Sequence, residues 1–266
     1  LESVLTRLDR CPSGAAAGFG APVPLDRDLT ASLLGFSRVQ RSPIDVISSR
    51  GRHEVAVADA LASIALVIEK ACWDLSLWTM EEFGFAKLPD AFTTGSSIMP
   101  QKRNPDVLEL ARGTCRSARG QASALRELAG GLPTSYHREA QLLKAPLVAL
   151  LDTVEGLLAV LPRMLEGLEV NAEACAEACS DDLYAAHAAS RLAAEGLPFR
   201  DAYRAVAKDL LIGAFEPTPA DRATATCDLD SPWQELRILQ TRYQFRLDTW
   251  QARFEALFTA PLSPEP

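Results

Sequence analysis

Basic residues are scarce in this sequence of 266 residues. It holds 27 Lys and Arg against 35 Asp and Glu, which gives a formal net charge of −8. A nucleic-acid surface needs clustered Lys and Arg to neutralise phosphates, and the sequence has no such cluster. We therefore expect no nucleic-acid partner, although an acidic protein still binds an anion where a site is locally basic.

Cysteine pairs and histidine clusters are missing as well. No Cys-x-x-Cys pair occurs, and the three histidines stand in distant contexts, so no zinc pattern is complete. The sequence therefore predicts no metal site and favours reduced thiols in a cytosolic protein. The six cysteines are Cys11, Cys72, Cys115, Cys175, Cys179 and Cys227.

Long uncharged apolar runs and targeting signals are also lacking. The best apolar run, residues 60–68, is closed by Asp59 and Glu69 and is too short to span a membrane. No signal-peptide pattern is present. These features favour a cytoplasmic protein without a membrane partner.

Strand patterns are almost absent, whereas helical periodicity is extensive. Apolar residues spaced by three and four predict long helices over residues 54–83, 105–128 and 141–168. Shorter helices follow residue 171, including one over residues 199–215 and one over residues 233–257. The expected fold is all-α, with a long-helix bundle in residues 1–170 and a small helical C-terminal domain in residues 171–266. Long helices expose more apolar surface than one chain covers, so we expect self-association.

Particular residues predict where these helices begin and end. Gly84 and Gly130 are expected to end the first two long helices. Asn104 is expected to cap the second helix, with Pro105 at its first position. Thr30 is expected to cap a short helix that reaches residue 34, while residues 38–52 are expected to be irregular. Two prolines, Pro146 and Pro162, should kink the third long helix or mark its ends.

The first eight residues, LESVLTRL, place apolar side chains at helical spacing. We interpret them as the last turns of a helix whose beginning is absent, so the chain is expected to be a fragment.

The segment GSSIMPQKRNP, residues 95–105, fits neither a strand pattern nor an apolar helical stripe. An ordered loop before a helix accounts for Asn104 and Pro105 but not for two serines, Lys102 and Arg103. Together these residues place hydroxyl groups and positive charge beside a helix N-terminus, which favours anions. A carboxylate substrate is the expected ligand.

This segment resembles the signature of the fumarase/aspartase superfamily, whose members eliminate fumarate from a substituted succinate. The variant here, with Gln after Met-Pro and NPDxxEL after Lys-Arg, is similar to that of the argininosuccinate lyases. Four further segments, SGAAAGFGAPVPLDRDLTA, RSPIDVISSRGR, LPTSYHREAQLLK and EGLPFRDAY, are similar to segments of that family. The resemblance implies an all-α tetramer without metal or organic cofactor, whose active sites combine segments of several subunits.

The resemblance also implies roles for individual residues. Ser96 corresponds to the catalytic base, and Lys102 and Asn104 would stabilise the doubly charged aci-carboxylate formed when the proton leaves carbon. Because a serine hydroxyl is a weak base, Lys102 and nearby amides would have to lower its pKa. Glu109 corresponds to a residue that orients a histidine from another part of the enzyme, although alone it reads as a solvated helix carboxylate. Ser97, Arg27, Tyr136, Gln141 and Lys144 correspond to substrate-binding positions.

The expected reaction is cleavage of argininosuccinate into arginine and fumarate by proton abstraction and β-elimination. One alternative is a lyase for another substituted succinate, although adenylosuccinate lyases usually have His where Gln101 stands. The other is a non-catalytic structural oligomer of the same fold. The family's N-terminal Ser-Arg-Asn-Asp-Gln segment and Thr-His pair do not occur. We therefore interpret the chain as the C-terminal two thirds of such a lyase and expect no activity from it alone.

Overall fold

The structure, a computed structural model, describes residues 2–223 and 230–259. The chain separates into two compact units: residues 1–170 with 244–266, and residues 171–243. Two sequence expectations, on Leu1 and Cys227, fall outside the described residues. The domain boundary after residue 170 stays a prediction.

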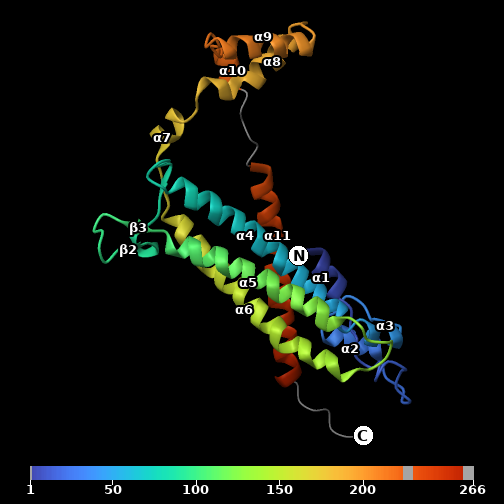
Figure 1. Cartoon of the computed structure of the whole chain (residues 1–266). Coiled ribbons are helices and arrows are strands. Elements are labelled where there is room, and N and C mark those ends of the chain that lie inside the picture. Colours follow the sequence, from blue (N-terminus) through green and yellow to red (C-terminus); the bar gives the residue numbers. More distant parts are fainter. Residues whose placement is uncertain (1, 224–229, 260–266) are drawn as a thin grey trace. The chain divides into compact units, whose positions relative to one another are not determined.

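Three long helices form the core of the first unit (Figure 1). They are α4 (Arg52–Trp78), α5 (Asp106–Ala129) and α6 (Lys144–Glu166). Each buries one face in a shared apolar cluster. Small side chains line the part of this cluster between α4 and α5. They are Ala58, Ala65 and Cys72 on α4, and Ala111, Cys115, Ala118 and Ala122 on α5.

A charged cluster joins α4 to α5 beside these small residues. Glu69 on α4 is largely buried and pairs with Arg116 at 3.0 Å and with Arg119 at 2.6 Å, both on α5. A buried carboxylate needs such partners, because desolvation disfavours an unpaired charge. The cluster therefore favours one register of α4 against α5.

The ends of α4 and α5 differ partly from the sequence expectation. The second helix ends at Ala129 before Gly130, as predicted, but α4 ends at Trp78 rather than at residue 83. A hydrogen bond from Phe85 N–H to the Trp78 carbonyl closes the turn after α4, and Gly84 lies in that turn with φ +59°. Gly84 therefore ends the turn and not the helix itself.

The expected Asn104 cap is wrong. Asn104 belongs to β3 (Arg103–Asn104), which pairs antiparallel with β2 (Thr94–Gly95), and Pro105 occupies the N-cap position of α5. A residue before proline favours extended backbone, which suits Asn104 to a strand. The Thr94 hydroxyl hydrogen-bonds to the carboxylate of Asp106, the first residue of α5, and so ties the hairpin to that helix.

The N-terminal segment contains α1 (Glu2–Leu8), α2 (Arg27–Leu33) and α3 (Pro43–Ser48). The cap of α2 is Asp26 and not the expected Thr30, because the Asp26 carboxylate accepts the Leu29 N–H at 2.8 Å. The expectation of an irregular stretch over residues 38–52 is also wrong. Ser42 caps α3 and Pro43 follows at its first position, where a missing N–H carries no cost.

Short elements complete the first unit. A 3₁₀ turn, η1, spans Asp90–Phe92, and η2 (Arg138–Leu143) leads directly into α6. The strand β1 (Ala86–Lys87) pairs with β4 (Glu169–Val170). Pro146 lies in the first turn of α6, whereas Pro162 lies inside the helix without ending it.

The segment Arg138–Glu166 has the length and hydropathy of a membrane-crossing helix, a feature also found in core helices of soluble proteins. In the structure it packs one face, with Leu150, Val154 and Leu157, into the core. The apolar side chains of Val148, Leu151 and Leu158 stay exposed. One apolar face of α6 is therefore left uncovered by the part of the chain that the structure describes.

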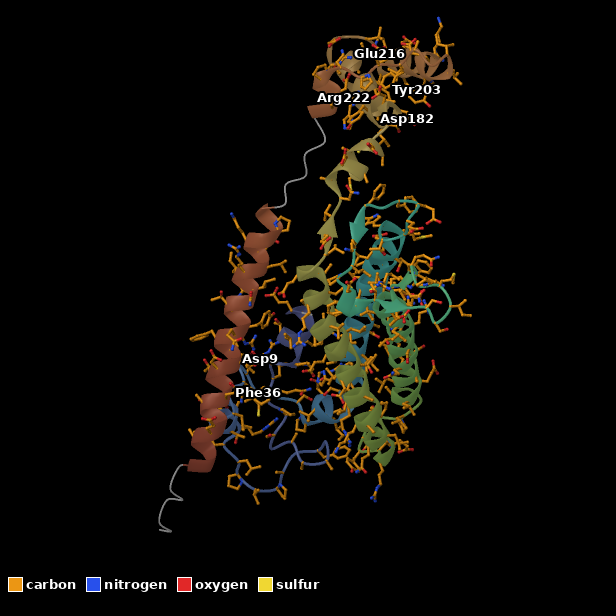
Figure 2. The ribbon with its side chains drawn as sticks, turned by 90° about the vertical axis from the view of Figure 1, so that its left-hand side faces the viewer. Asp9, Phe36, Asp182, Tyr203, Glu216 and Arg222 are labelled. Carbon is orange, nitrogen blue, oxygen red and sulfur yellow. The ribbon has the colours of Figure 1, made fainter. Side chains whose placement is uncertain are left out.

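The second unit consists of short helices. They are α7 (Ala172–Glu177), η3 (Asp181–Tyr184), α8 (Ala185–Ala194), α9 (Phe199–Leu211) and α10 (Pro219–Ala223). The last helix, α11 (Asp230–Thr259), starts in this unit and continues into the first one. There, Arg246 pairs at 2.8 Å with Asp9, which Figure 2 labels.

A buried carboxylate organises the second unit. Asp221 on α10 accepts hydrogen bonds from the Arg191 guanidinium of α8 at 2.9 Å and from the hydroxyl and amide of Thr218 at 2.7 and 2.9 Å. The Arg191 hydrogen bond is the main cause that lowers the pKa of Asp221 from 3.8 to about 2. Asp221 therefore stabilises the folded unit in its charged form.

We predict that this unit loses stability in acid because of Asp221. Its folded pKa of about 2 lies below the unfolded value of 3.8, so its contribution is complete above about pH 4 and disappears as the pH falls towards 2. Asp221→Asn should cost about 1.5–3 kcal/mol at pH 7 and flatten this acid dependence. Amide exchange of α8 and α9 between pH 2.5 and 6 measures both effects, and an unchanged acid slope would contradict the assignment.

Candidate functional site

The segment GSSIMPQKRNP, residues 95–105, forms most of a hairpin at one end of the bundle. Strands β2 and β3 hold residues 96–102 between them, next to the first turn of α5 (Figure 1). The Ser96 hydroxyl oxygen accepts hydrogen bonds from the N–H groups of Ile98 and Met99, each at 3.2 Å. A hydrogen bond from Lys102 N–H to the Met99 carbonyl at 3.1 Å closes the loop.

This geometry suits Ser96 to carry negative charge. Two backbone N–H groups directed at one oxygen stabilise an alkoxide, which is what a serine base requires. The Lys102 ammonium is exposed and makes no ion pair with any described residue, so it is available to an anion. Ser97 is exposed in the same loop, and Asn104 is half-buried in β3.

Glu109 lies one turn further along α5 and is exposed. Within the part of the chain that the structure describes, it makes no ion pair and contacts no histidine. Its proposed task of orienting a histidine therefore needs a residue from elsewhere. The five residues Ser96, Ser97, Lys102, Asn104 and Glu109 form one group, which we call the hairpin wall.

A second group follows the other end of α5. Tyr136 lies in the connection to η2, Gln141 lies in η2, and Lys144 is the first residue of α6; all three are exposed. The guanidinium of Arg50 stacks over the Tyr136 ring at 5.0 Å from its centre. The preceding residue, Ser135, has φ +137°, an uncommon backbone conformation for a residue with a side chain. We call Tyr136, Gln141 and Lys144 the Tyr136 wall.

Arg27 has a structural task in this chain. Its guanidinium donates hydrogen bonds to the carbonyl oxygens of Ser13 at 2.9 Å, Gln40 at 2.8 Å and Arg41 at 3.0 Å. Gly14, with φ +81°, lies so close that a Cβ there would approach the Arg27 side chain to 2.9 Å. Arg27 thus links the loop before α2 to the loop after it. Its substrate-binding role stays a prediction.

The two walls do not meet within one chain. Helix α5 separates them, and its 24 residues correspond to about 36 Å at 1.5 Å per residue. Figure 1 shows β2 and β3 at one end of α5 and the connection to α6 at the other. A substrate the size of an amino-acid derivative cannot bridge that distance.

A pocket of about 510 Å³ opens beside the Tyr136 wall, and sequence reasoning missed its polar residues. Tyr136, Arg10, Gln40, Arg50 and His53 contribute to its lining. Two of them, Gln40 and Arg50, lie in the polar stretch 38–52, which was expected to be irregular. Burial, followed by the charges of Arg52 and Arg10, lowers the pKa of His53 below its ordinary value.

Metal ligands do not gather anywhere in the described part of the chain, where no three His, Cys, Asp or Glu side chains form a group able to hold an ion.

Comparison with known proteins gives consistent relatives. A family profile described as "Lyase" matches residues 1–120. An argininosuccinate lyase of Sorangium cellulosum is 45% identical over 203 residues, which is 76% of this chain and 47% of the relative. Another from Xylella fastidiosa is 38% identical over 262 residues, 98% of this chain and 56% of the relative. The chain thus spans about half the length of the curated relatives it matches.

Solved structures share the fold. A class II fumarase from Schistosoma mansoni has a TM-score of 0.65 and 16% identity, over 80% of this chain and 48% of its own. A lyase for EDDS in complex with formate has a TM-score of 0.59 and 24% identity, over 80% and 42%. These similarities confirm the expected all-α bundle.

We predict that Ser96 orders the hairpin loop. Ser96→Ala removes the acceptor of two N–H groups, so solvent exchange of the Ile98 and Met99 amides should accelerate about fivefold, the equivalent of roughly 1 kcal/mol. Ser97→Ala, one residue away and exposed, is the control and should leave these rates unchanged. NMR measures the exchange rates of the Ile98 and Met99 amides. Equal rates in the wild type and Ser96→Ala would contradict the described hydrogen bonds.

Proposed function

We propose that this chain belongs to the argininosuccinate lyase family of the fumarase/aspartase superfamily, to which its relatives point, and that it forms part of a cytoplasmic enzyme that splits argininosuccinate into arginine and fumarate. The observation that supports this proposal best is the Ser96 hydroxyl oxygen, which accepts hydrogen bonds from two N–H groups in the same loop as Lys102. Lys102 makes no ion pair with a described residue. The proposed reaction needs no redox cofactor, because it is an elimination without net oxidation.

The proposed chemistry begins with Ser96 as the base. Its alkoxide removes a proton from the carbon beside a carboxylate of the succinate part, and the electron pair moves into that carboxylate. Lys102 and Asn104 stabilise the resulting doubly charged aci-carboxylate. The pair then forms the C=C bond of fumarate as the C–N bond breaks, and the leaving nitrogen takes up a proton to give arginine.

We further propose that each active site combines walls from different copies of the chain. The hairpin wall and the Tyr136 wall are separated by the length of α5, so the hairpin wall of one copy has to meet the Tyr136 wall of another. The uncovered apolar face of α6, with Val148, Leu151 and Leu158, supports such association. A homotetramer with composite sites satisfies both requirements.

The first functional prediction concerns the chain as it stands. The 266-residue chain should show no fumarate release, whereas addition of the part of the Xylella fastidiosa relative that lies outside the alignment should restore measurable release from argininosuccinate. Ultraviolet absorbance of fumarate is the assay, and adenylosuccinate is the comparison substrate. Faster release from adenylosuccinate would identify a different lyase, and no release from either substrate would favour a non-catalytic oligomer.

The second functional prediction tests the composite site. Ser96→Ala damages the hairpin wall and Lys144→Met damages the Tyr136 wall, so each variant alone should be nearly inactive in the restored assembly. Unfolded and refolded together, they should recover roughly a quarter of the wild-type activity, because random association creates sites with two intact walls. A mixture no more active than its components would show that both walls come from one chain.

A further inference from the structure

The pocket beside Tyr136 has an apolar part and a charged part. Leu8, Phe36, Val46 and Ile47 supply apolar surface, and the polar lining comes from the segment around Arg50, His53 and Glu54. With a volume of about 510 Å³ it accommodates a molecule of the size of an amino acid. The charged part determines which kind of amino-acid end the pocket favours.

Most charges near the pocket are already matched. Asp45 pairs with Arg52 at 2.9 Å and with Arg10 at 3.6 Å. The Glu54 carboxylate accepts the N–H of Gly51 at 2.7 Å. Among the described residues, Arg50 has no carboxylate within ion-pair distance. The pocket therefore keeps one guanidinium whose charge is not neutralised.

The stacking of Arg50 on Tyr136 leaves its hydrogen-bonding edge available. A guanidinium uses its face for an aromatic ring, while its N–H donors lie in the plane and match the two oxygens of a carboxylate. The stack holds the group in one orientation, with its carbon 5.0 Å from the ring centre.

Two histidines, His53 and His137, line pockets to which Arg50 also contributes. His53 Nδ1 is buried without a hydrogen-bond partner among the described residues, and so is His137 Nε2. His137 lines a neighbouring pocket of about 280 Å³, to which Arg50 also contributes. Buried polar atoms are normally paired, so this cluster has unused capacity for a polar ligand.

We propose that Arg50 is a substrate-binding residue that takes the α-carboxylate at the amino-acid end of the substrate, with its methylene chain on the apolar wall. This inference rests on the proposed function, because it adds Arg50 to the Tyr136 wall and names the part of the substrate bound there. It makes Tyr136 a residue that orients Arg50 as well as one that lines the site.

The test compares L-arginine with agmatine, which has the same side chain and amine but no carboxylate. Equilibrium binding to the 266-residue chain is followed by NMR of ¹³C-labelled histidine. His53 and His137 report on the site, and His187, in the second unit, is the internal reference. L-Arginine should shift the His53 signal saturably and bind at least about tenfold more tightly than agmatine. The net charge of −8 would favour the doubly charged agmatine, so this preference cannot come from long-range attraction.

Variants assign the preference to Arg50. Arg50→Gln should weaken L-arginine binding about tenfold, to the level of agmatine, while Arg50→Lys should retain part of the preference because it keeps the charge but loses the planar donors. Arg52→Gln is the matched control: Arg52 is already paired with Asp45, so binding should change by less than about twofold. Circular dichroism verifies that each variant is folded.

Several outcomes would overturn the assignment. They are equal binding of L-arginine and agmatine, unchanged L-arginine binding in Arg50→Gln, no saturable shift of His53, or an equal shift of His187. Binding is measured without turnover, so it separates this inference from the lyase proposal. One outcome is that L-arginine binds selectively and needs Arg50, while the assembly releases no fumarate. That outcome would support the proposed role of Arg50 and contradict the proposed lyase activity. Fumarate release with a KM unchanged by Arg50→Gln would support the lyase activity and contradict the role of Arg50.

Discussion

Close packing of α4 on α5 is the interaction on which the first unit depends. Alanine and cysteine side chains on both helices allow the two backbones to approach, and Leu108 and Leu125 fill the space on either side. The ion pairs of Glu69 on α4 with Arg116 and Arg119 on α5 disfavour a shift of one helix along the other, because such a shift would leave a buried carboxylate unpaired.

This packing limits where along α5 a ligand can bind. The candidate site residues lie at the two ends of α5, where the helix gives way to the hairpin or to the connection into α6. Between those ends, buried side chains pack α5 against α4. The composite site proposed above would need one end of α5 to meet the opposite end of α5 from another copy of the chain. Antiparallel association of α5 helices from different copies would provide that arrangement.

Much of the fold follows from the sequence because helical periodicity is a local signal. The long helices, the end of α5 at Gly130 and the later short helices were predicted within a few residues. The errors arose where a local rule had a competitor. Asn104 is a good cap by residue type, but Pro105 and pairing with Thr94 favour the strand, and a strand of two residues has no periodic pattern. Helix α3 is likewise too short to show a stripe.

The candidate site was predictable only in part, for a related reason. The hairpin wall is one continuous segment, so a motif identifies it, although its roles stay predictions. Arg50 and His53 are far in sequence from Tyr136, and only tertiary packing brings them to one pocket. Arg27 shows the reverse: its sequence context indicated a binding role, whereas its three carbonyl partners show that it also holds loops together.

The backbone of Ser135 has a consequence for affinity. A residue with a side chain at φ +137° carries a conformational cost of about 1–3 kcal/mol, which the flanking α5 and η2 must offset. The next residue, Tyr136, is thereby directed by the main chain as well as by its own stacking contact. A ring that is preorganised in this way loses little conformational entropy when a ligand arrives. Ser135→Gly would relieve this strain and, by freeing the backbone before Tyr136, would weaken the ligand binding proposed for the Tyr136 wall.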